Sequence, residues 1–235
     1  MRIAKLSGAM FSIAIIAGVL GYQFNRQSHA LLIASDVAIN EVADKKHPLS
    51  NALQRYALDA SQSKFIAHAS AGGLLWFKGH AHLVAVRDFT GEARLDPDLI
   101  TAASLEIIAK AGSMGETSSV FTEPQKQIID KELREIVLEP DKYPEIVFKS
   151  TSVTGKAAAN SQYDLKIAGD LTLHGVTRPI TIPVKVSVTG NDLRAQGEFS
   201  IDRGDFKVKA TSAFHGLVRV RDKVKFEFDI VGHRL

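Results

Sequence analysis

The segment DLKIAGDLTLHGVTRPITIPVKVSVTGNDLRAQGEFSID, residues 164–202, decides the fold. Apolar or small residues recur at every second position through three parts of it. Successive side chains of a β-strand point to opposite faces, so each part predicts a strand with one apolar and one hydrated face. The apolar positions are Leu165, Ile167, Gly169, Leu171 and Leu173, then Ile180, Ile182, Val184, Val186 and Val188, then Leu193, Ala195, Gly197, Phe199 and Ile201.

Short connections at residues 174–179 and 189–191 separate these three strands. They indicate antiparallel neighbours, because a parallel crossover needs about a dozen residues or more. Pro183 has no N–H to donate to a ladder, so we expect an edge or a bulge there. A fourth alternating stretch near the C-terminus carries Val224, Phe226, Phe228 and Ile230 on its apolar face.

Weaker alternation upstream predicts five more strands, at residues 65–69, 74–78, 82–95, 103–109 and 145–153. About nine antiparallel strands in one domain are typical of a closed barrel. A two-sheet sandwich is the alternative. Helical periodicity is scarce, which argues against a parallel fold.

One helix interrupts the strands. Thr122 and Gln125 have the spacing of a capping box, and Pro124 suits the first helical turn. One apolar face follows, and Pro140 ends the run. We expect the helix to cover one side or mouth of the barrel. Its apolar face consists of Ile128, Ile129, Leu133, Ile136 and Val137.

Charge and cysteine content limit the classes of function. The formal charge of +3 belongs entirely to the first thirty residues, which contain Arg2, Lys5 and Arg26 and no acid. The rest of the chain carries equal numbers of basic and acidic residues, so it has no net charge with which to attract nucleic acid. The chain contains no cysteine, which excludes disulfides, thiolate metal sites and a cysteine nucleophile.

The N-terminus has the pattern of an export segment. Arg2 and Lys5 precede an uncharged run over residues 6–24, and residues 28–30 offer a small-x-small cleavage site. We therefore expect a signal peptide at residues 1–30, with an uncleaved membrane anchor as the alternative. Residues 31–54 are interpreted as a linker, part of it helical, and residues 55–235 as the barrel domain.

Three segments carry a resemblance to a known family. IAGDLTLHGVTRP at residues 167–179 matches a strand, a G-V-T-x-P turn and the next strand, and DKYPEIVFKS at residues 141–150 matches Y-P-x-I-x-F-x-S. YALD at residues 56–59, with Ser63 and Phe65, is similar to an opening strand. In this order the segments resemble the YceI-like family, exported lipocalin-like barrels associated with binding polyisoprenoid lipids. The resemblance implies an all-β, antiparallel lipocalin-like β-barrel with one α-helix between strands.

Two segments depart from the family pattern. Residues 199–208 resemble its R-S-D-F-G-I stretch, but Gly204 replaces the serine and Lys207 replaces the glycine, so the local turn is expected to differ. Gly79-His80-Ala81-His82 stands where many relatives have a longer apolar strand that contains a histidine.

The apolar barrel face is the candidate ligand site, and the resemblance implies a tunnel for a prenyl chain. Gly169, Ala195 and Gly197 remove side-chain volume there, which leaves room for a ligand or for large neighbours. Arg178, Arg203 and Lys207 lie on connections or strand ends and are candidates for a head group. The predicted apolar ligand residues are Leu165, Ile167, Gly169, Leu171, Ala195, Gly197, Phe199, Phe226 and Phe228.

His80 and His82 are the only metal candidates, and they are weak ones. Residues two apart on a strand share a face, so both imidazoles could reach one metal ion, with His174, His215 or His233 as a third ligand. A hydrogen-bonded pair near the mouth is the alternative, and we expect no metal and no cofactor. The chain contains no G-x-S-x-G elbow, phosphate-binding loop or Rossmann fingerprint.

These features predict an exported, non-enzymatic protein of the bacterial periplasm that encloses a polyisoprenoid or similar long-chain lipid. Membrane contact and a homodimer are further expectations, whereas nucleic acid is not an expected partner. Two alternatives remain: a stress or interaction protein whose barrel is packed solid, and a metal hydrolase that uses the histidine pair.

Overall fold

A computed structural model describes residues 53–235 except residues 214 and 216. The predicted signal or anchor at residues 1–30, and all but the end of the predicted linker, lie outside the described residues. The first strand starts at Gln54, next to the predicted start of the barrel domain. Over the described residues, no helix has the length and apolar character needed to cross a membrane.

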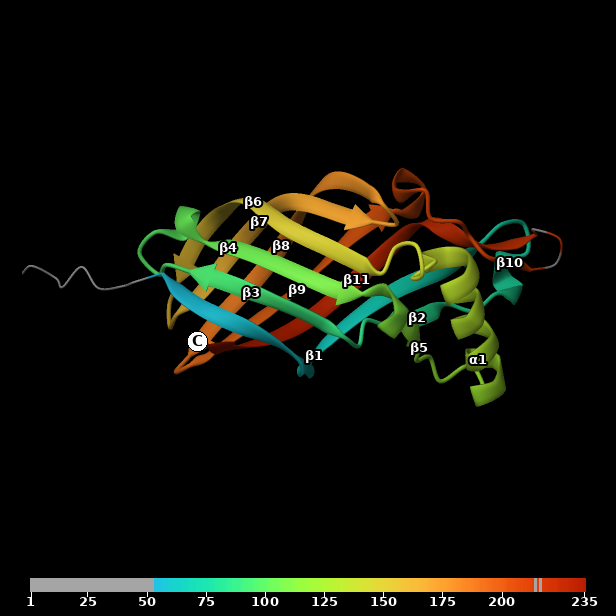
Figure 1. The fold of residues 1–235 in the computed structure, drawn as a ribbon, viewed down its shortest axis with the longest axis horizontal. Coiled ribbons are helices and arrows are strands. Elements are labelled where there is room, and N and C mark those ends of the chain that lie inside the picture. The colour runs from blue at the N-terminus through green and yellow to red at the C-terminus, as the bar shows by residue number, and fades with distance from the viewer. Residues whose placement is uncertain (1–52, 214, 216) are drawn as a thin grey trace, which may run out of the picture. The chain divides into compact units, whose positions relative to one another are not determined.

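Eight antiparallel strands close into a barrel, as Figure 1 shows. The last strand pairs with the first, and this pairing removes the open edges of the sheet. The predicted fold class is confirmed, and the sandwich alternative is wrong. The strands are β1 (Gln54–Gly72), β3 (Phe89–Leu95), β4 (Ser104–Lys110), β6 (Glu145–Ala158), β7 (Gln162–Leu173), β8 (Val176–Thr189), β9 (Asp192–Asp202) and β11 (Val218–Arg234).

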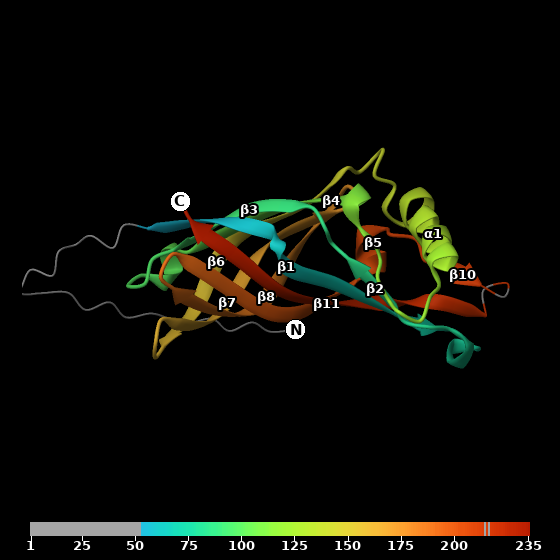
Figure 2. The same ribbon diagram turned by 90° about the horizontal axis from the view of Figure 1, so that it is seen from below.

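Shorter elements gather at one end of the barrel, next to α1 (Glu123–Glu132), as Figure 2 shows. They include β2 (His82–Ala85), β5 (Gly115–Glu116) and β10 (Ser212–Ala213), each paired to the long sheet or to one another. The C-terminus lies at the opposite end. The remaining helical turns are η1 (Trp76–Lys78), η2 (Ile100–Ala102), η3 (Ala111–Ser113), η5 (Arg203–Phe206) and the π-helical η4 (Leu133–Leu138), which continues α1.

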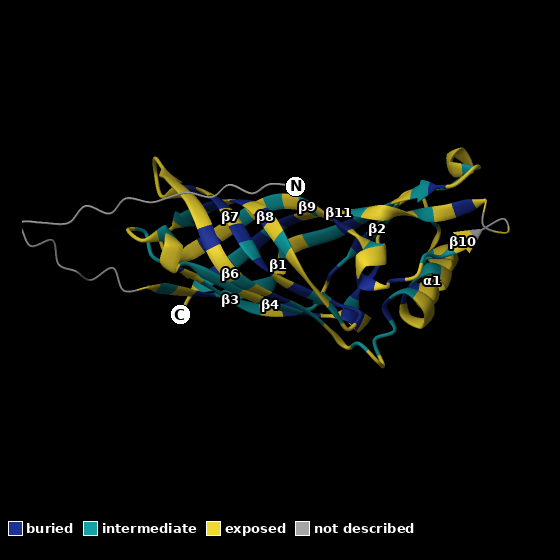
Figure 3. Ribbon diagram, turned by 90° about the horizontal axis from the view of Figure 1, so that it is seen from above, coloured by how far each residue is buried: buried dark blue, intermediate teal, exposed yellow. Residues whose placement is uncertain are grey.

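The period of two holds through β7, β8 and β9, where buried and exposed residues alternate (Figure 3). The connection predicted at residues 174–179 is shorter than expected, because β8 already begins at Val176. His174 and Gly175 alone form the turn, with φ angles of 52° and 71°. Two left-handed residues make a hairpin turn that matches strand twist, so pairing continues up to Leu173 and Val176.

Two upstream strand predictions need correction. Residues 74–78 form no strand: the chain leaves the ladder at Gly73, where φ is +90°, and then makes the turn η1. The single strand predicted at residues 82–95 is divided into β2 and β3. Both strands pair with β1: β2 pairs with the second half of β1, and β3 pairs with its first half. Residues 86–88 therefore connect two separate ladders.

Pro183 lies where a ladder stops. β8 pairs with β9 from Thr189 to Val184, and Pro183 is the first residue beyond that pairing. The prediction of an edge at Pro183 is confirmed on the β9 side. On the other side β8 stays paired with β7 throughout. The end of β8 next to α1 is therefore attached to the sheet along one side only.

The helix begins as predicted and buries less than predicted. Its capping box joins Thr122 and Gln125 at the N-terminus. The predicted apolar face is only partly covered, because the Ile128 side chain is 62% exposed and Ile136 is 39% exposed. Leu133 and Leu138 are buried in the π-helical continuation. The wider turn of a π-helix rotates the face, so a strict 3.6-residue period includes Leu133 but misses Leu138.

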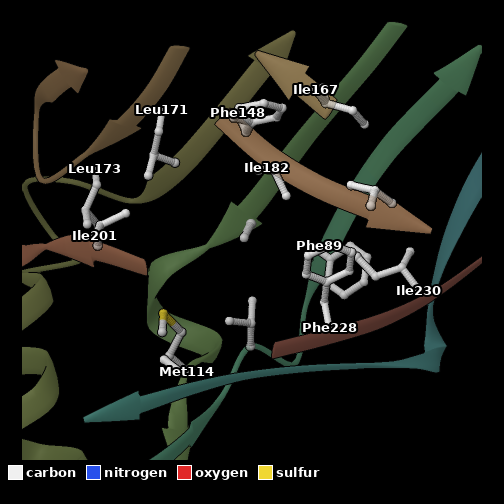
Figure 4. Close-up of a cluster of buried hydrophobic side chains, with 14 of the residues drawn as sticks. Phe89, Met114, Phe148, Ile167, Leu171, Leu173, Ile182, Ile201, Phe228 and Ile230 are labelled. Carbon is white, nitrogen blue, oxygen red and sulfur yellow. The ribbon is translucent and has the colours of Figure 1, made fainter. Parts of the chain in front are cut away.

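The hydrophobic core is formed by side chains on the inner face of the barrel strands. Figure 4 shows Phe148, Ile167, Leu171 and Ile182 from β6, β7 and β8 projecting into the interior. Tyr56 and Phe206 are the largest fully buried side chains among the described residues. Burial of such apolar side chains supplies most of the stabilisation expected for this barrel.

Candidate functional site

An apolar cavity of about 570 Å³ occupies the barrel interior. Side chains from all eight long strands and from α1 line it, so the closed sheet itself shapes the site. Its volume falls within the range of ordinary small-molecule sites. Seven of the nine predicted apolar ligand residues line the cavity: Leu165, Ile167, Leu171, Ala195, Phe199, Phe226 and Phe228.

Gly169 and Gly197 do not line the cavity, which corrects their predicted role. A Cβ atom at Gly169 would lie 2.6 Å from Cζ of Phe148, and a Cβ atom at Gly197 would lie 2.7 Å from Cζ of Phe228. The two phenylalanine rings therefore occupy the volume that the glycines free. The glycines serve close packing, and they leave no room for a ligand.

Alanines provide the space that the glycines do not. β1 contributes three of them at alternate positions, in line with the period of a strand. Sequence reasoning missed them, because alanine is found on both faces of strands and carries little pattern. The only signal was their spacing after Phe65. The alanines that line the cavity are Ala67, Ala69, Ala71, Ala93, Ala103, Ala109, Ala195 and Ala210.

A cluster of phenylalanines forms one wall of the cavity. The rings of Phe199 and Phe226 stack across β9 and β11, with centroids 4.9 Å apart. Phe65 of β1 packs edge-on against Phe226 at 6.0 Å and against Phe228 at 6.2 Å. Aromatic rings add a large apolar surface in a fixed geometry, so this wall suits a hydrocarbon chain that lies along it.

Most of the polar side chains that line the cavity lie at its end next to α1, whereas Arg94 and Ser104 line it at the opposite end. Gln125 and Glu132 come from the helix, which confirms that the helix covers a mouth of the barrel. The mouth therefore combines charge with an apolar interior behind it, the arrangement that holds an amphipathic molecule in one orientation. The charged and histidine side chains that line this end are Lys78, His80, His82, Glu132, Arg203, Lys209 and Arg219.

Of the three predicted head-group residues, only Arg203 lines the cavity. Its guanidinium donates to the carbonyl oxygen of Val208 at 2.7 Å and to Oδ1 of Asp222 at 2.5 Å. Its Nε atom is buried and has no hydrogen-bond partner among the described residues. Arg203 is thus held in place by two hydrogen bonds, while its buried Nε–H is unpaired in the described part of the chain.

Arg178 and Lys207 lie outside the cavity lining, which corrects their predicted role. Arg178 is exposed and donates from Nε to the carbonyl oxygen of Asp205. Lys207 is an exposed residue with φ of 57°, at the end of η5. Its left-handed backbone is the conformation that glycine favours, so the turn expected to differ from the family pattern keeps a glycine-like shape.

The two candidate metal ligands contact an aromatic ring. His82 stacks on Phe121 with centroids 5.1 Å apart, and His80 meets the same ring edge-on at 5.8 Å. Nδ1 of His82 lies 2.8 Å from Oε2 of the buried Glu116. Within the described part of the chain, no three histidine or acidic side chains gather as a metal site would require. The geometry supports the alternative for His82, which is hydrogen-bonded near the mouth, while His80 contacts Phe121.

The other histidines named as a third ligand lie elsewhere or have other contacts. His174 bonds Oε2 of Glu139 at 3.0 Å and packs against Tyr143. His233, at the far end of the barrel, bonds Asp192 at 2.8 Å and Asp59 at 3.3 Å. These two hydrogen bonds raise the pKa of the His233 imidazole. His215 is an exposed turn residue.

Comparison with solved structures shows the same fold at low sequence identity. BcnA from Burkholderia cenocepacia superposes with a TM-score of 0.58 and 20% identity, over 74% of this chain and 98% of that one. A polyisoprenoid binding domain from Saccharophagus degradans superposes with a TM-score of 0.56 and 14% identity, over 77% and 98%.

Sequence comparison finds relatives in other bacteria. A UPF0312 protein of Vibrio parahaemolyticus is 31% identical over 146 residues, which cover 62% of this chain and 69% of that protein. Protein YceI of Escherichia coli is 31% identical over 163 residues, which cover 65% of this chain and 78% of that protein. The sequence profile of the YceI-like domain matches residues 56–232. The chain belongs to the YceI-like family.

Proposed function

We propose that this protein is a lipid-binding barrel that encloses a long apolar chain, of polyisoprenoid or isoprenoid quinone type, for carriage or storage. The apolar cavity of about 570 Å³ carries the proposal, because it gives a hydrocarbon chain a water-free interior. The description of the Saccharophagus degradans domain as polyisoprenoid-binding supports the ligand class, since that domain has the same fold.

Burial of the chain is sufficient for binding, with no bond made or broken. Each buried methylene group contributes about 0.8 kcal/mol, so about ten of them contribute roughly 8 kcal/mol. A binding free energy of that size corresponds to a Kd of about 1 µM. A polyisoprenoid has many more such groups than ten, so part of it can remain outside the barrel at little cost to affinity.

A polar head group is assigned to the mouth, next to Arg203. The Arg203 side chain lines the cavity, and its guanidinium group carries a positive charge. A phosphate or quinone oxygen would accept a hydrogen bond from this guanidinium group, and a charge-assisted bond of this kind is stronger than a neutral one. Arg203→Gln is therefore expected to weaken binding of prenyl phosphates more than binding of prenyl alcohols.

Export to the bacterial periplasm forms part of the proposal. It rests on the basic residues Arg2 and Lys5 and the apolar run that follows them. The protein would be membrane-anchored if this segment is not cleaved. N-terminal sequencing of protein from the periplasmic fraction tests both points, and an intact Met1 in soluble cytosol would contradict export.

The lipid proposal is tested by extracting protein purified from its own organism with organic solvent and identifying the extract by mass spectrometry. Wild type is expected to yield a stoichiometric long-chain lipid. Ala195→Phe places a ring in the cavity and is expected to abolish the co-purified lipid. Ala157→Phe, on the exposed side of β6, is the matched control and is expected to retain the lipid. Ala195→Leu gives a smaller obstruction if the phenylalanine variant does not fold.

Lipid-free extracts of wild type would contradict the proposal, if the purified protein also fails to take up a prenyl lipid from solution. Equal lipid content in Ala195→Phe and Ala157→Phe would place the ligand outside the cavity.

The alternatives receive less support. A barrel packed solid is contradicted by the cavity itself. A hydrolase based on His80 and His82 lacks a geometric basis, because the His82 imidazole is held by Glu116 and stacks on Phe121.

A further inference from the structure

The end of β1 projects an apolar tip from the barrel. After Gly73 the chain forms the turn Leu74–Phe77, and this turn is exposed: Leu74 is 77%, Trp76 is 56% and Phe77 is 63% accessible. Leu217 of the facing segment is 42% exposed. Soluble proteins rarely expose several large apolar side chains together without a partner for them. We call Leu74, Trp76, Phe77 and Leu217 the apolar tip.

The backbone under the tip is well anchored. The N–H of Leu75 donates to the carbonyl oxygen of Leu217 at 2.9 Å, and Nε of Arg221 donates to the carbonyl oxygen of Ala71 at 2.9 Å. Gly73 approaches Leu217 so closely that a Cβ atom there would lie 2.5 Å from its carbonyl oxygen. The apolar side chains are therefore presented on a fixed support, and the rings of Trp76 and Phe77 brace each other edge-on at 6.4 Å.

Basic residues surround the tip. The two segments that form it, residues 71–80 and 209–223, contain a single acid, Asp222, and that acid pairs with Arg203. None of the described ion pairs neutralises the bases nearest the tip, Lys78 and Arg219. The bases of the two segments are Lys78, Lys209, Arg219, Arg221 and Lys223.

The tip lies at the mouth of the cavity. Figure 2 shows the turn after β1, drawn in teal, beyond the barrel at the end that carries α1. The base of the tip itself lines the cavity, through Ala71, Lys78 and Arg219. A surface that receives the tip therefore faces the opening through which a ligand would pass.

We propose that this tip docks the protein on an anionic lipid bilayer, with Trp76 and Phe77 at the level of the head groups. Tryptophan with phenylalanine, flanked by lysine and arginine, is the composition that favours a membrane interface. The positive surroundings complement anionic lipid head groups. The inference goes beyond the proposed function, because docking does not require that the cavity hold a lipid.

The test uses a property of the sequence: Trp76 is the only tryptophan of the chain. Its emission in the full-length protein therefore reports on the tip alone, even if residues 1–30 also bind vesicles. Vesicles of phosphatidylcholine and phosphatidylglycerol in equal parts are expected to shift the emission to the blue. Lipids brominated near the head group are expected to quench it more than lipids brominated at the chain end. Pure phosphatidylcholine is expected to shift it less.

Matched variants separate the tip from the rest of the surface. Phe77→Ser is expected to weaken vesicle affinity by about ten-fold, whereas Leu99→Ser, an exposed apolar residue at the opposite end, leaves it unchanged. Lys78→Gln with Arg219→Gln is expected to weaken it by about five-fold per charge. Lys149→Gln with Lys156→Gln on exposed β6 is the control for charge. Ala195→Phe, which obstructs the cavity, is expected to show the same emission shift as wild type. The docking proposal is therefore tested independently of the lipid proposal.

Two results would overturn the inference. Unchanged Trp76 emission in protein that floats with the vesicles would place the contact elsewhere on the chain. A blue shift that depends on protein concentration without vesicles, together with dimers in sedimentation, would show that the tip packs against a second copy.

Discussion

The ring of Phe228 lies over Gly197, so that a Cβ atom at residue 197 would be 2.7 Å from Cζ of Phe228. The carbonyl oxygen of Pro183 blocks the same position. Two strands, β8 and β11, thus approach β9 at the one residue that has no side chain. The contact fixes how closely the phenylalanine wall of the cavity sits against the sheet.

Gly197→Ala is expected to destabilise the barrel by about 2 kcal/mol, as overpacking of a filled interior does. Gly204→Ala is the control, since no atom lies within 4 Å of a Cβ atom at that position. Urea unfolding of the two variants measures the difference in the free energy of unfolding. Equal stabilities would show that the Phe228 ring moves aside freely.

Lys207→Gly is expected to stabilise the protein by about 1 kcal/mol. Lys207 has φ of 57°, and a left-handed conformation costs a residue with a side chain roughly that much relative to glycine. Lys207→Ala keeps the backbone strain and removes the charge, so it should not stabilise. Thermal unfolding of the three proteins distinguishes a backbone effect from a charge effect, and a gain in the alanine variant would contradict the backbone explanation.

Glu116→Ala is expected to destabilise the backbone around β2 and β5 at the mouth of the cavity. Oε1 of this buried carboxylate accepts the backbone N–H groups of Leu83, Thr117 and Ser118, at 3.1, 2.9 and 2.7 Å. Removing this acceptor leaves the N–H groups of Leu83 and Ser118 without it, which costs about 1–3 kcal/mol for each group, whereas the N–H of Thr117 also donates to the carbonyl oxygen of Leu83 at 2.8 Å. Glu116→Gln keeps one carbonyl oxygen for these donors and should lose much less stability.

Hydrogen exchange checks the Glu116 prediction at the amides of Leu83 and Ser118. Their protection should fall sharply in Glu116→Ala and remain in Glu116→Gln, while amides of β7 stay protected in both. Uniform loss of protection across the barrel would argue against a local role for the carboxylate.

His233 is expected to make stability depend on pH. Its hydrogen bonds to Asp192 and Asp59 raise the imidazole pKa above the usual 6.5, because the charged form is favoured in the folded protein. The stabilisation is therefore fully present below pH 6.5 and is lost as the pH rises through the raised folded-state pKa. In acid, below the usual aspartate range, it is lost again, because hydrogen bonds from Ser61 and Gln62 lower the pKa of Asp59 and protonation removes the partner.

The measurement compares urea midpoints of wild type and His233→Gln from about pH 5 to pH 9. The wild type should be the more stable at pH 5 to 6, and the difference should shrink toward pH 9. A difference that stays constant or grows with pH would contradict the assignment.

Much of the fold could be predicted from the sequence where strands have one wet and one apolar face. In β7 every second residue is accessible to solvent, so the alternation of polar and apolar residues directly predicts which side chains point inward. The prediction of a strand at residues 74–78 is wrong, because the weak alternation that suggested it belongs to an exposed turn. Hydropathy alone does not distinguish a side chain that packs inside from one that projects outward.

The site could be predicted less well than the fold. Alternation identifies which face points inward, and so Phe199, Phe226 and Phe228 were found. It does not say at which inward position a side chain of the adjacent strand fills the space. Gly169 is the example: the ring that fills its space, Phe148, comes from β6, and only the register between β6 and β7 brings them together.

The ladder between β8 and β9 ends at Val184 and Gly197, and this has a consequence for selectivity. Beyond that point, next to α1, the two strands are joined through η5 and side chains such as Arg178, without the strand-to-strand ladder. Side chains and η5 close the barrel wall at this place, while backbone pairing holds the two strands together at the other end. Substitutions in η5 and at residues 176–183 can therefore change which molecules are admitted without altering the register of the sheet.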